Sequence, residues 1–279
     1  MGDLICALPI MRALARIHGG KINLITSPLC WQLAPLLWEQ PYIESCTLDD
    51  AGPYELQGGI VNRWNYFLAG GGINLSPQPR FYAPGAPISY TDCYKQVAGV
   101  EALLPEDTVV LPSLVNHRRW HFGFEVVRDG VRQQTPPTVI LAPESETLER
   151  IAPVPLLVWK EIAYTLGDAF QIVIVGQKRN HDWIGTPNTL DLRGLTTVSS
   201  LARLIAEARG FFGPLSLPWH LARFCEMPCI CVQEIPLTLI RSMPTDSEYL
   251  WATPSDVKHA IRRMQDLMAA EPFKLQQAA

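Results

Sequence analysis

The fold class is decided by Gln171 Ile172 Val173 Ile174 Val175 Gly176. Its nearly unbroken run of β-branched residues is typical of a strand buried on both faces of a parallel sheet. Apolar residues recur at helical spacing on either side of it, in Leu156–Leu166 upstream and Ser199–Arg209 downstream, and Thr138–Pro143 shows a second strand-and-turn pattern. Short apolar strands that alternate with helices predict βαβ units and a doubly wound α/β domain.

The helix expected at Ser199–Arg209 has the clearest pattern of the chain, with an apolar stripe formed by Leu201, Leu204, Ile205 and Ala208. Such a stripe indicates one face packed on a sheet. A hydroxyl side chain at the start of a helix accepts hydrogen bonds from its first backbone N–H groups, so Ser199 or Ser200 is the expected cap.

The same alternation occurs near the N-terminus. Helices are expected at Leu8–His18 and Cys30–Trp38, and strands at Lys21–Thr26 and Glu44–Leu48. A chain of 279 residues exceeds the usual size of one core. The polar, proline-containing break at Gln133–Pro137 therefore predicts two domains, residues 1–135 and 136–279. The Gly- and Pro-rich residues 52–87 are expected to form long loops, a possible wall for a second substrate.

Charge and composition exclude several classes of protein. A formal net charge of -4 argues against non-specific binding of nucleic acid, which needs clustered Lys and Arg. Residues 116–121, with two Arg, two His and a Trp, are the one local basic cluster; a solvated loop is the simpler interpretation. Neither a signal peptide nor a run of about eighteen apolar residues is visible, which predicts a cytoplasmic protein without a membrane span.

The seven cysteines are scattered, which is typical of reduced cytosolic thiols. Cys225, Cys229 and Cys231 lie close together, but their spacing lacks a second ligand pair for a metal. The apolar context from Met227 to Val232 favours a buried strand instead. No metal site and no cofactor are predicted.

Two segments carry a family resemblance. Gly2 Asp3 Leu4 Ile5 Cys6 Ala7 Leu8 Pro9 Ile10 Met11 Arg12 Ala13 Leu14 resembles the G-D-x-x-x-x-x-P-x-x-R-x-L opening of the ADP-heptose:lipopolysaccharide heptosyltransferases of glycosyltransferase family 9. Asp191 Leu192 Arg193 Gly194 Leu195 Thr196 Thr197, a helix, and then Gly213 Pro214 Leu215 Ser216 Leu217 Pro218 Trp219 His220 Leu221 Ala222 resemble that family's D-L-x-G-x-T-S-L and G-N-D-S-G-P-x-H-L-A elements. Weaker similarities at residues 142–145 and 159–160 complete an ordered set over most of the chain.

This resemblance implies the GT-B architecture of two Rossmann-like domains, with a nucleotide-diphosphate sugar on the C-terminal domain and a saccharide or glycolipid acceptor on the N-terminal one. It implies that Asp3 is the general base, although capping of a Leu4–His18 helix would equally suit an Asp there. The resemblance also implies that Arg12 contacts the acceptor. The donor-binding residues implied are Ser145, Arg150, Lys178, Ser216, Leu217 and His220. Lys178 and Arg150 would neutralise the leaving diphosphate. Without the resemblance, the simpler interpretation of these two residues is ordinary surface charge, and that of His220 is a structural histidine.

The chain also departs from the family pattern. Leu215 replaces an Asp, Leu217 replaces a Gly, and Glu144 replaces the Gly of a P-G-A turn, which places a negative charge near the expected diphosphate unless Arg150 or Lys178 offsets it. The family's β-strand before G-D is also missing, so the N-terminal domain is expected to lack the usual first strand.

Two functions follow, and they belong to different classes. The first is an inverting, metal-independent transferase that moves a heptose-like sugar from a nucleotide diphosphate to a saccharide. The second is a degenerate transferase kept as a binding or assembly protein. A transferase that acts on a nucleic-acid base rests only on residues 116–121 and is disfavoured by net charge.

Overall fold

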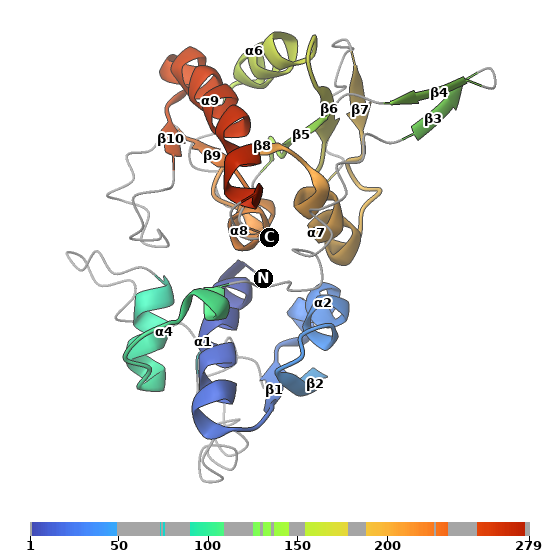
Figure 1. Cartoon of the computed structure of the whole chain (residues 1–279). Coiled ribbons are helices and arrows are strands. Elements are labelled where there is room, and N and C mark those ends of the chain that lie inside the picture. The colour runs from blue at the N-terminus through green and yellow to red at the C-terminus, as the bar shows by residue number, and fades with distance from the viewer. Residues whose placement is uncertain are drawn as a thin grey trace. The chain divides into compact units, whose positions relative to one another are not determined.

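The computed structural model describes residues 2–48, 73, 75, 90–108, 125–128, 131–134, 137–144, 154–177, 188–225, 227–233 and 250–276. Contacts divide the chain into two compact units, residues 1–111 with 237–245 and residues 112–236 with 246–279 (Figure 1). The expected basic cluster at 116–121 lies outside the described residues, as do the expected loops at 52–87 apart from residues 73 and 75.

The second unit is built on a parallel sheet whose six strands have the order β10-β9-β8-β5-β6-β7. In chain order these strands are β5 (Thr138–Leu141), β6 (Gln171–Ile174), β7 (Thr189–Asp191), β8 (Gly210–Gly213), β9 (Cys229–Val232) and β10 (Leu250–Ala252). Numbered from β5 as first, the order is 3-2-1-4-5-6, which is that of a Rossmann dinucleotide-binding sheet. The doubly wound α/β prediction for this half is confirmed.

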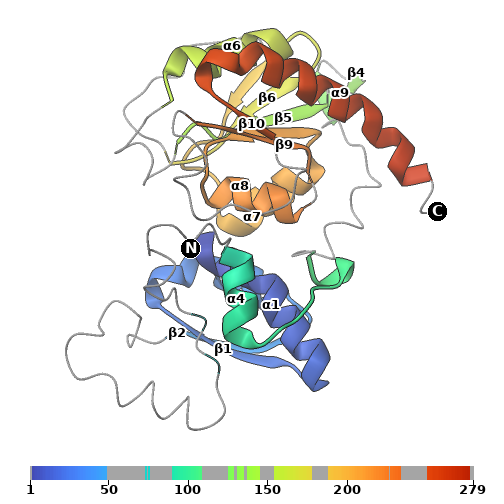
Figure 2. The same cartoon turned by 90° about the vertical axis from the view of Figure 1, so that its left-hand side faces the viewer.

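Helices cover both faces of this sheet (Figure 2). One face carries α6 (Leu156–Leu166) and α9 (Val257–Gln276), preceded by a short 3₁₀ helix at Pro254–Asp256. The other face carries α7 (Val198–Glu207) and α8 (Leu217–Phe224). Under α6 and α9, Trp159, Ile162 and Met264 join side chains of β5, β6, β8 and β9 in one core cluster. The helix predicted at Leu156–Leu166 is therefore confirmed, because its apolar residues face the sheet.

The cap of α7 differs from the expectation. Thr197, not Ser199 or Ser200, is the N-cap residue: its Oγ1 accepts a hydrogen bond from the Ser200 backbone N–H at 3.2 Å. Ser200 is the third residue of the helix, and its Oγ accepts a bond from the Thr197 N–H at 2.8 Å. This reciprocal capping box satisfies two backbone donors at once, which neither serine could do alone.

The first unit begins with α1 (Gly2–His18), and its strands β1 (Ile22–Thr26) and β2 (Ile43–Leu48) pair in parallel. The remaining elements described here are a 3₁₀ helix at Pro28–Leu33, α2 (Ala34–Trp38), α4 (Tyr90–Ala98) and a 3₁₀ helix at Pro105–Thr108. Helix α1 starts six residues before the expected Leu8, and Pro9 lies inside it. Its residues Ile5, Leu8 and Ile10 are fully buried, so packing stabilises a helix that a proline would otherwise weaken.

The two arginines of α1 have different surroundings. The guanidinium of Arg16 donates to the carboxylate of Asp107 at 2.7 Å, and Asp107 is only 1% exposed. That carboxylate also accepts the Leu104 N–H at 2.9 Å, so the end of α1 is tied to the segment after α4. Arg12, the expected acceptor-side residue, is partly exposed. Arg12 also affects Tyr42: burial raises the pKa of the Tyr42 hydroxyl, and the positive charge of Arg12 lowers it by a smaller amount.

The predicted domain boundary remains a prediction. Strands β3 (Glu125–Arg128) and β4 (Val131–Gln134) form an antiparallel hairpin that is a sheet of its own, and contacts group it with the second unit. Gln133 and Gln134 belong to β4, so the polar break proposed at Gln133–Pro137 begins inside a strand. Within the described residues, no helix combines the length and the apolar character that crossing a membrane requires.

Candidate functional site

The strand order of the second unit points to one place where a ligand would bind. After β5 the chain continues outward through β6 and β7, and it then returns to the other side of β5 to form β8, β9 and β10. Ligands of such sheets bind beyond the carboxyl ends of the strands at this reversal, which here lies between β5 and β8. The residues that follow these two strands are Ala142–Glu144 and Pro214–Ser216.

Glycine is required at the end of β8. A Cβ atom on Gly213 would lie 2.9 Å from the ring of Phe211 and 3.1 Å from the backbone oxygen of Ala142. A side chain of any size would push β8 away from the end of β5, where the N–H of Ala142, the residue after β5, donates to the carbonyl of Phe212 at 2.9 Å. Gly213 therefore allows the two strands to stay close where the chain turns into α8.

Helix α8 begins at this edge of the sheet. Ser216 precedes it with an extended backbone (φ -158°), but its side chain makes no capping bond. Instead, Ser216 Oγ donates to the carbonyl of Pro214 at 3.1 Å. A helix N-terminus carries a partial positive charge and directs backbone N–H groups outward, which makes it suitable for a phosphate. Ser216 thus holds the loop before α8 in shape.

Leu217, where the family has Gly, does not strain the backbone. It is the first residue of α8 and half-buried. Among the described residues, Asn188 is the only non-glycine with a positive φ. Leucine at this position therefore needs no left-handed conformation, and the effect of Leu217 is confined to the volume of its side chain.

An ion network lies beside the reversal, and sequence reasoning missed its central residue. Arg193 is 3% exposed and donates to both carboxylate oxygens of Asp191, at 2.9 and 2.8 Å. It also donates to Glu144 Oε1 at 3.3 Å. Within the described residues, the negative charge of Glu144 is thus offset by Arg193, a cation that the sequence did not suggest for this role. Arg193 lies in the D-L-R-G motif, but no pattern of neighbouring residues indicates that it binds Glu144, 49 residues away.

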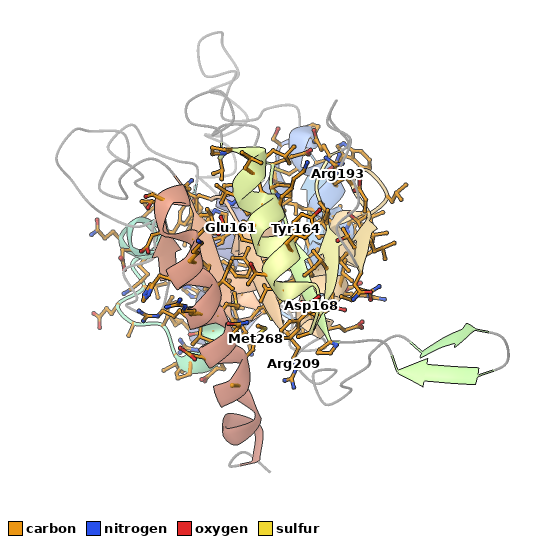
Figure 3. All side chains as sticks on the ribbon, turned by 90° about the horizontal axis from the view of Figure 1, so that it is seen from above. Glu161, Tyr164, Asp168, Arg193, Arg209 and Met268 are labelled. Atoms are coloured by element: carbon orange, nitrogen blue, oxygen red, sulfur yellow. The ribbon has the colours of Figure 1, made fainter. Side chains whose placement is uncertain are left out.

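The network residues lie at the ends of β5 and β7, on either side of the end of β6. Glu144 follows β5, Asp191 ends β7, and Gly176 between them follows β6 with φ +134°. A Cβ on Gly176 would lie 3.2 Å from Glu144 Oε2, so this glycine leaves room for the carboxylate. Figure 3 shows Arg193 at one end of the sheet, with Asp168 and Arg209 at the other. The network combines two carboxylates with one guanidinium.

His220 is buried inside the second unit, at 5% exposure. Its ring meets that of Trp219 edge-on, with centroids 5.4 Å apart. Burial, with a smaller contribution from the positive charge of Arg223, lowers the pKa of His220 to about 3. At neutral pH the imidazole is therefore uncharged, and any contact that it made with a phosphate would be a hydrogen bond, not an ion pair.

A buried neutral histidine makes stability depend on pH. The folded-state pKa is about 3 and the unfolded value is near 6.5, so the unfolded chain binds the extra proton between these values. The contribution of the neutral imidazole to the free energy of unfolding is fully present above pH 6.5. It is lost as the pH falls towards 3, by up to about 1.4 kcal/mol per pH unit. We expect His220→Leu to lose less stability from pH 7 to pH 4 than the parent in urea titrations. His259→Leu, which removes an exposed histidine of α9, should follow the parent; equal slopes for all three proteins would contradict this assignment.

The other predicted site residues are only partly described. Ser145, Arg150 and Lys178 lie outside the described residues. Asp3 lies in the first turn of α1, so its backbone is helical and it does not precede the helix as a cap; its side chain is not described. These roles remain predictions.

The clustered cysteines form no metal site in the described part of the chain. Cys229 and Cys231 lie in β9, which is buried along its whole length, as the sequence predicted. Burial raises the pKa of the Cys229 thiol to about 12, so it stays protonated. Within the described ranges, no group of three or more His, Cys, Asp or Glu side chains could hold a metal ion.

The second unit is thus a doubly wound α/β domain with Rossmann strand order, and its candidate site lies at the strand reversal. No protein-family model and no curated protein matches the sequence. Solved structures match it over nearly its whole length. The glycosyltransferase family 9 protein from Veillonella parvula DSM 2008 is 14% identical and aligns over 95% of this chain and 86% of its own, with a TM-score of 0.63.

Two enzymes of E. coli show the same similarity. The ADP-heptose LPS heptosyltransferase II is 14% identical over 97% of this chain and 96% of its own, with a TM-score of 0.64. Heptosyltransferase WaaC, solved with ADP, is 12% identical over 95% and 97%, also with a TM-score of 0.64. The chain therefore has the α/β fold of the family 9 heptosyltransferases, which confirms the predicted fold class.

Proposed function

We propose that this protein is a glycosyltransferase that moves a heptose-like sugar from a nucleotide-diphosphate donor to a saccharide or glycolipid acceptor. The observation that carries the proposal is the start of α8 at the strand reversal of a Rossmann-ordered sheet, directly after Gly213. The fold shared with heptosyltransferases over nearly the whole chain supports it.

In this proposal the second unit binds the donor. The backbone at the start of α8 and Ser216 would contact the diphosphate, and Arg150 and Lys178 would offset the charge of the leaving group. Because α8 contributes only a partial charge, at least one full cation is expected to be needed. His220, neutral and buried, would hold the α8 segment in position.

The proposed reaction is a single displacement. An acceptor hydroxyl oxygen bonds to the anomeric carbon of the sugar while Asp3 accepts the hydroxyl proton and Arg12 contacts the acceptor. The bond between that carbon and the diphosphate oxygen breaks, and the nucleoside diphosphate leaves with the bonding electrons. Attack opposite the leaving group inverts the anomeric configuration. Stabilisation of the leaving group by cations and helix N–H groups makes the proposed mechanism metal-independent.

A second candidate is a transferase-like protein that binds a donor or a partner but no longer turns over. It is favoured by Leu215 and Leu217, both half-buried beside the start of α8, because they replace the Asp and Gly of the family pattern. Leucine adds volume and removes a polar donor contact there. The Glu144–Arg193 pair adds a carboxylate that the family pattern lacks.

Calorimetric titration against ADP, UDP, GDP and their sugar conjugates, ADP-heptose included, tests both candidates. The first predicts micromolar binding of one nucleotide sugar and release of its nucleoside diphosphate when a saccharide acceptor is added. Tight binding without any turnover would support the degenerate protein. Absence of binding to every compound would contradict the transferase.

A further inference from the structure

Gln233 is a buried amide that the proposed roles leave unused. It directly follows β9 and is 5% exposed. Neither its Oε1 nor its Nε2 has a hydrogen-bond partner among the residues that the structure describes. Most buried polar side-chain atoms in proteins have at least one partner, so a fully unsatisfied amide calls for an explanation, and a bound ligand is one.

The position of Gln233 follows from the alternation along β9. Ile230 and Val232 belong to the core cluster under α6 and α9. Since side chains alternate along a strand, Gln233 continues the opposite face, which is the face that carries α7 and α8 (Figure 2). Strand β8 pairs with β9 so that Gly213 lies opposite Cys231. Gln233 lies two residues after Cys231, so it is level with the loop of residues 214–216 that leads from β8 into α8.

The charges around the reversal indicate which part of a donor would reach this amide. On the β5–β7 side, the described residues of the network place two carboxylates, Glu144 and Asp191, around the single guanidinium of Arg193. Carboxylate oxygens can accept hydrogen bonds from ribose hydroxyls, whereas they repel phosphate. The diphosphate then suits the start of α8. A donor laid out in this order places its transferred sugar on the β9 side.

We propose that Gln233 recognises hydroxyl groups of the transferred sugar; this inference rests on the proposed transferase function. A primary amide offers two donor hydrogens and a carbonyl acceptor. Neighbouring sugar hydroxyls can each donate and accept, so one amide can bond to two of them. Being neutral, Gln233 makes these bonds without adding another negative charge near the diphosphate.

The test compares two ligands on one variant. Gln233→Met removes the amide at similar volume, and affinities for ADP-heptose and ADP are measured by calorimetry. We expect the ratio of the two affinities to fall by about tenfold, the effect of losing hydrogen bonds to one sugar, while affinity for ADP alone is unchanged. If the panel shows that another nucleotide sugar binds more tightly, that donor and its own nucleoside diphosphate replace this pair.

Thermal unfolding without ligand supplies a second readout. Because the amide has no partner among the described residues, Gln233→Met should raise Tm by about 2–4 °C, whereas loss of a structural hydrogen bond would lower it. Gln171→Met is the matched control, since this half-buried glutamine starts β6 at the opposite end of the same sheet; both affinities should stay unchanged.

The possible outcomes distinguish failure of sugar recognition by Gln233 from failure of the proposed transferase function. An unchanged affinity ratio in Gln233→Met, or equal losses for ADP and ADP-heptose, overturns sugar recognition while the transferase proposal stands. A lowered Tm also counts against it, because it would show a structural partner for the amide. If the parent protein binds no nucleotide sugar of the panel, the proposed function and this inference fail together.

Discussion

Asp3→Ala is expected to lower the rate of sugar transfer by about 10²–10⁴-fold, the usual contribution of a general base. Without the carboxylate, the acceptor hydroxyl must lose its proton to water as it attacks. Because the proposed donor site is formed by the second unit, affinity for the nucleotide sugar should not change. Single-turnover kinetics with a bound donor and a saccharide acceptor would measure the rate, and calorimetry the affinity.

Two comparisons separate this role from a structural one. Asp3 lies in the first turn of α1, where a carboxylate stabilises a helix by about 0.3–1 kcal/mol. Asp3→Asn retains a hydrogen-bonding side chain but no base, so it should be as slow as Asp3→Ala. Asp168→Ala removes an exposed carboxylate from the turn after α6 and should keep the parent rate. Near-normal turnover of Asp3→Ala would contradict the proposed mechanism.

Arg193→Met is expected to destabilise the second unit by about 1–3 kcal/mol, less than for a fully buried ion pair, because Asp191 is 35% exposed while Glu144 is only 10% exposed. The guanidinium makes a two-bond contact with Asp191 and a third bond to Glu144, and its side chain is 3% exposed. Without it, the described part of the network keeps the carboxylates of Glu144 and Asp191 but loses the guanidinium that bonds to both. Urea denaturation, followed by tryptophan fluorescence, measures the change.

Two further variants check the cause of this loss. Arg262→Met removes an exposed arginine of α9 and should change stability by less than about 0.5 kcal/mol. Adding Glu144→Gln to Arg193→Met removes one of the two carboxylates that the guanidinium binds and should recover part of the loss. A loss below about 1 kcal/mol for Arg193→Met would mean that water screens the network as it screens a surface pair.

Local pattern predicted the elements of the second unit well. The apolar run at Gln171–Gly176 contains β6, and helical spacing located α6 at both ends, because each pattern depends only on neighbouring residues. Element ends were less certain. Helix α1 starts at Gly2, since burial of its first turns offsets the cost of Pro9, and burial by distant segments leaves no local mark.

The candidate site was predictable only in part. Ser216 and Leu217 lie at the strand reversal, at the start of α8, and their contacts with a donor remain predictions. The offset of Glu144 by Arg193 and the unsatisfied amide of Gln233 were not foreseen. Both depend on which strand ends are neighbours in the sheet, and strand order is set by packing across the whole unit.

By itself, the sequence determined the α/β class and the positions of most strands and helices in the second unit, because the period of apolar residues fixes which backbone conformation can bury them. Only the tertiary structure decided the order of the strands, and with it the place where the order reverses. It also decided the electrostatics of that place. Glu144 and His220 are a carboxylate and an imidazole in any sequence, but burial and distant partners make one a paired ion and keep the other neutral.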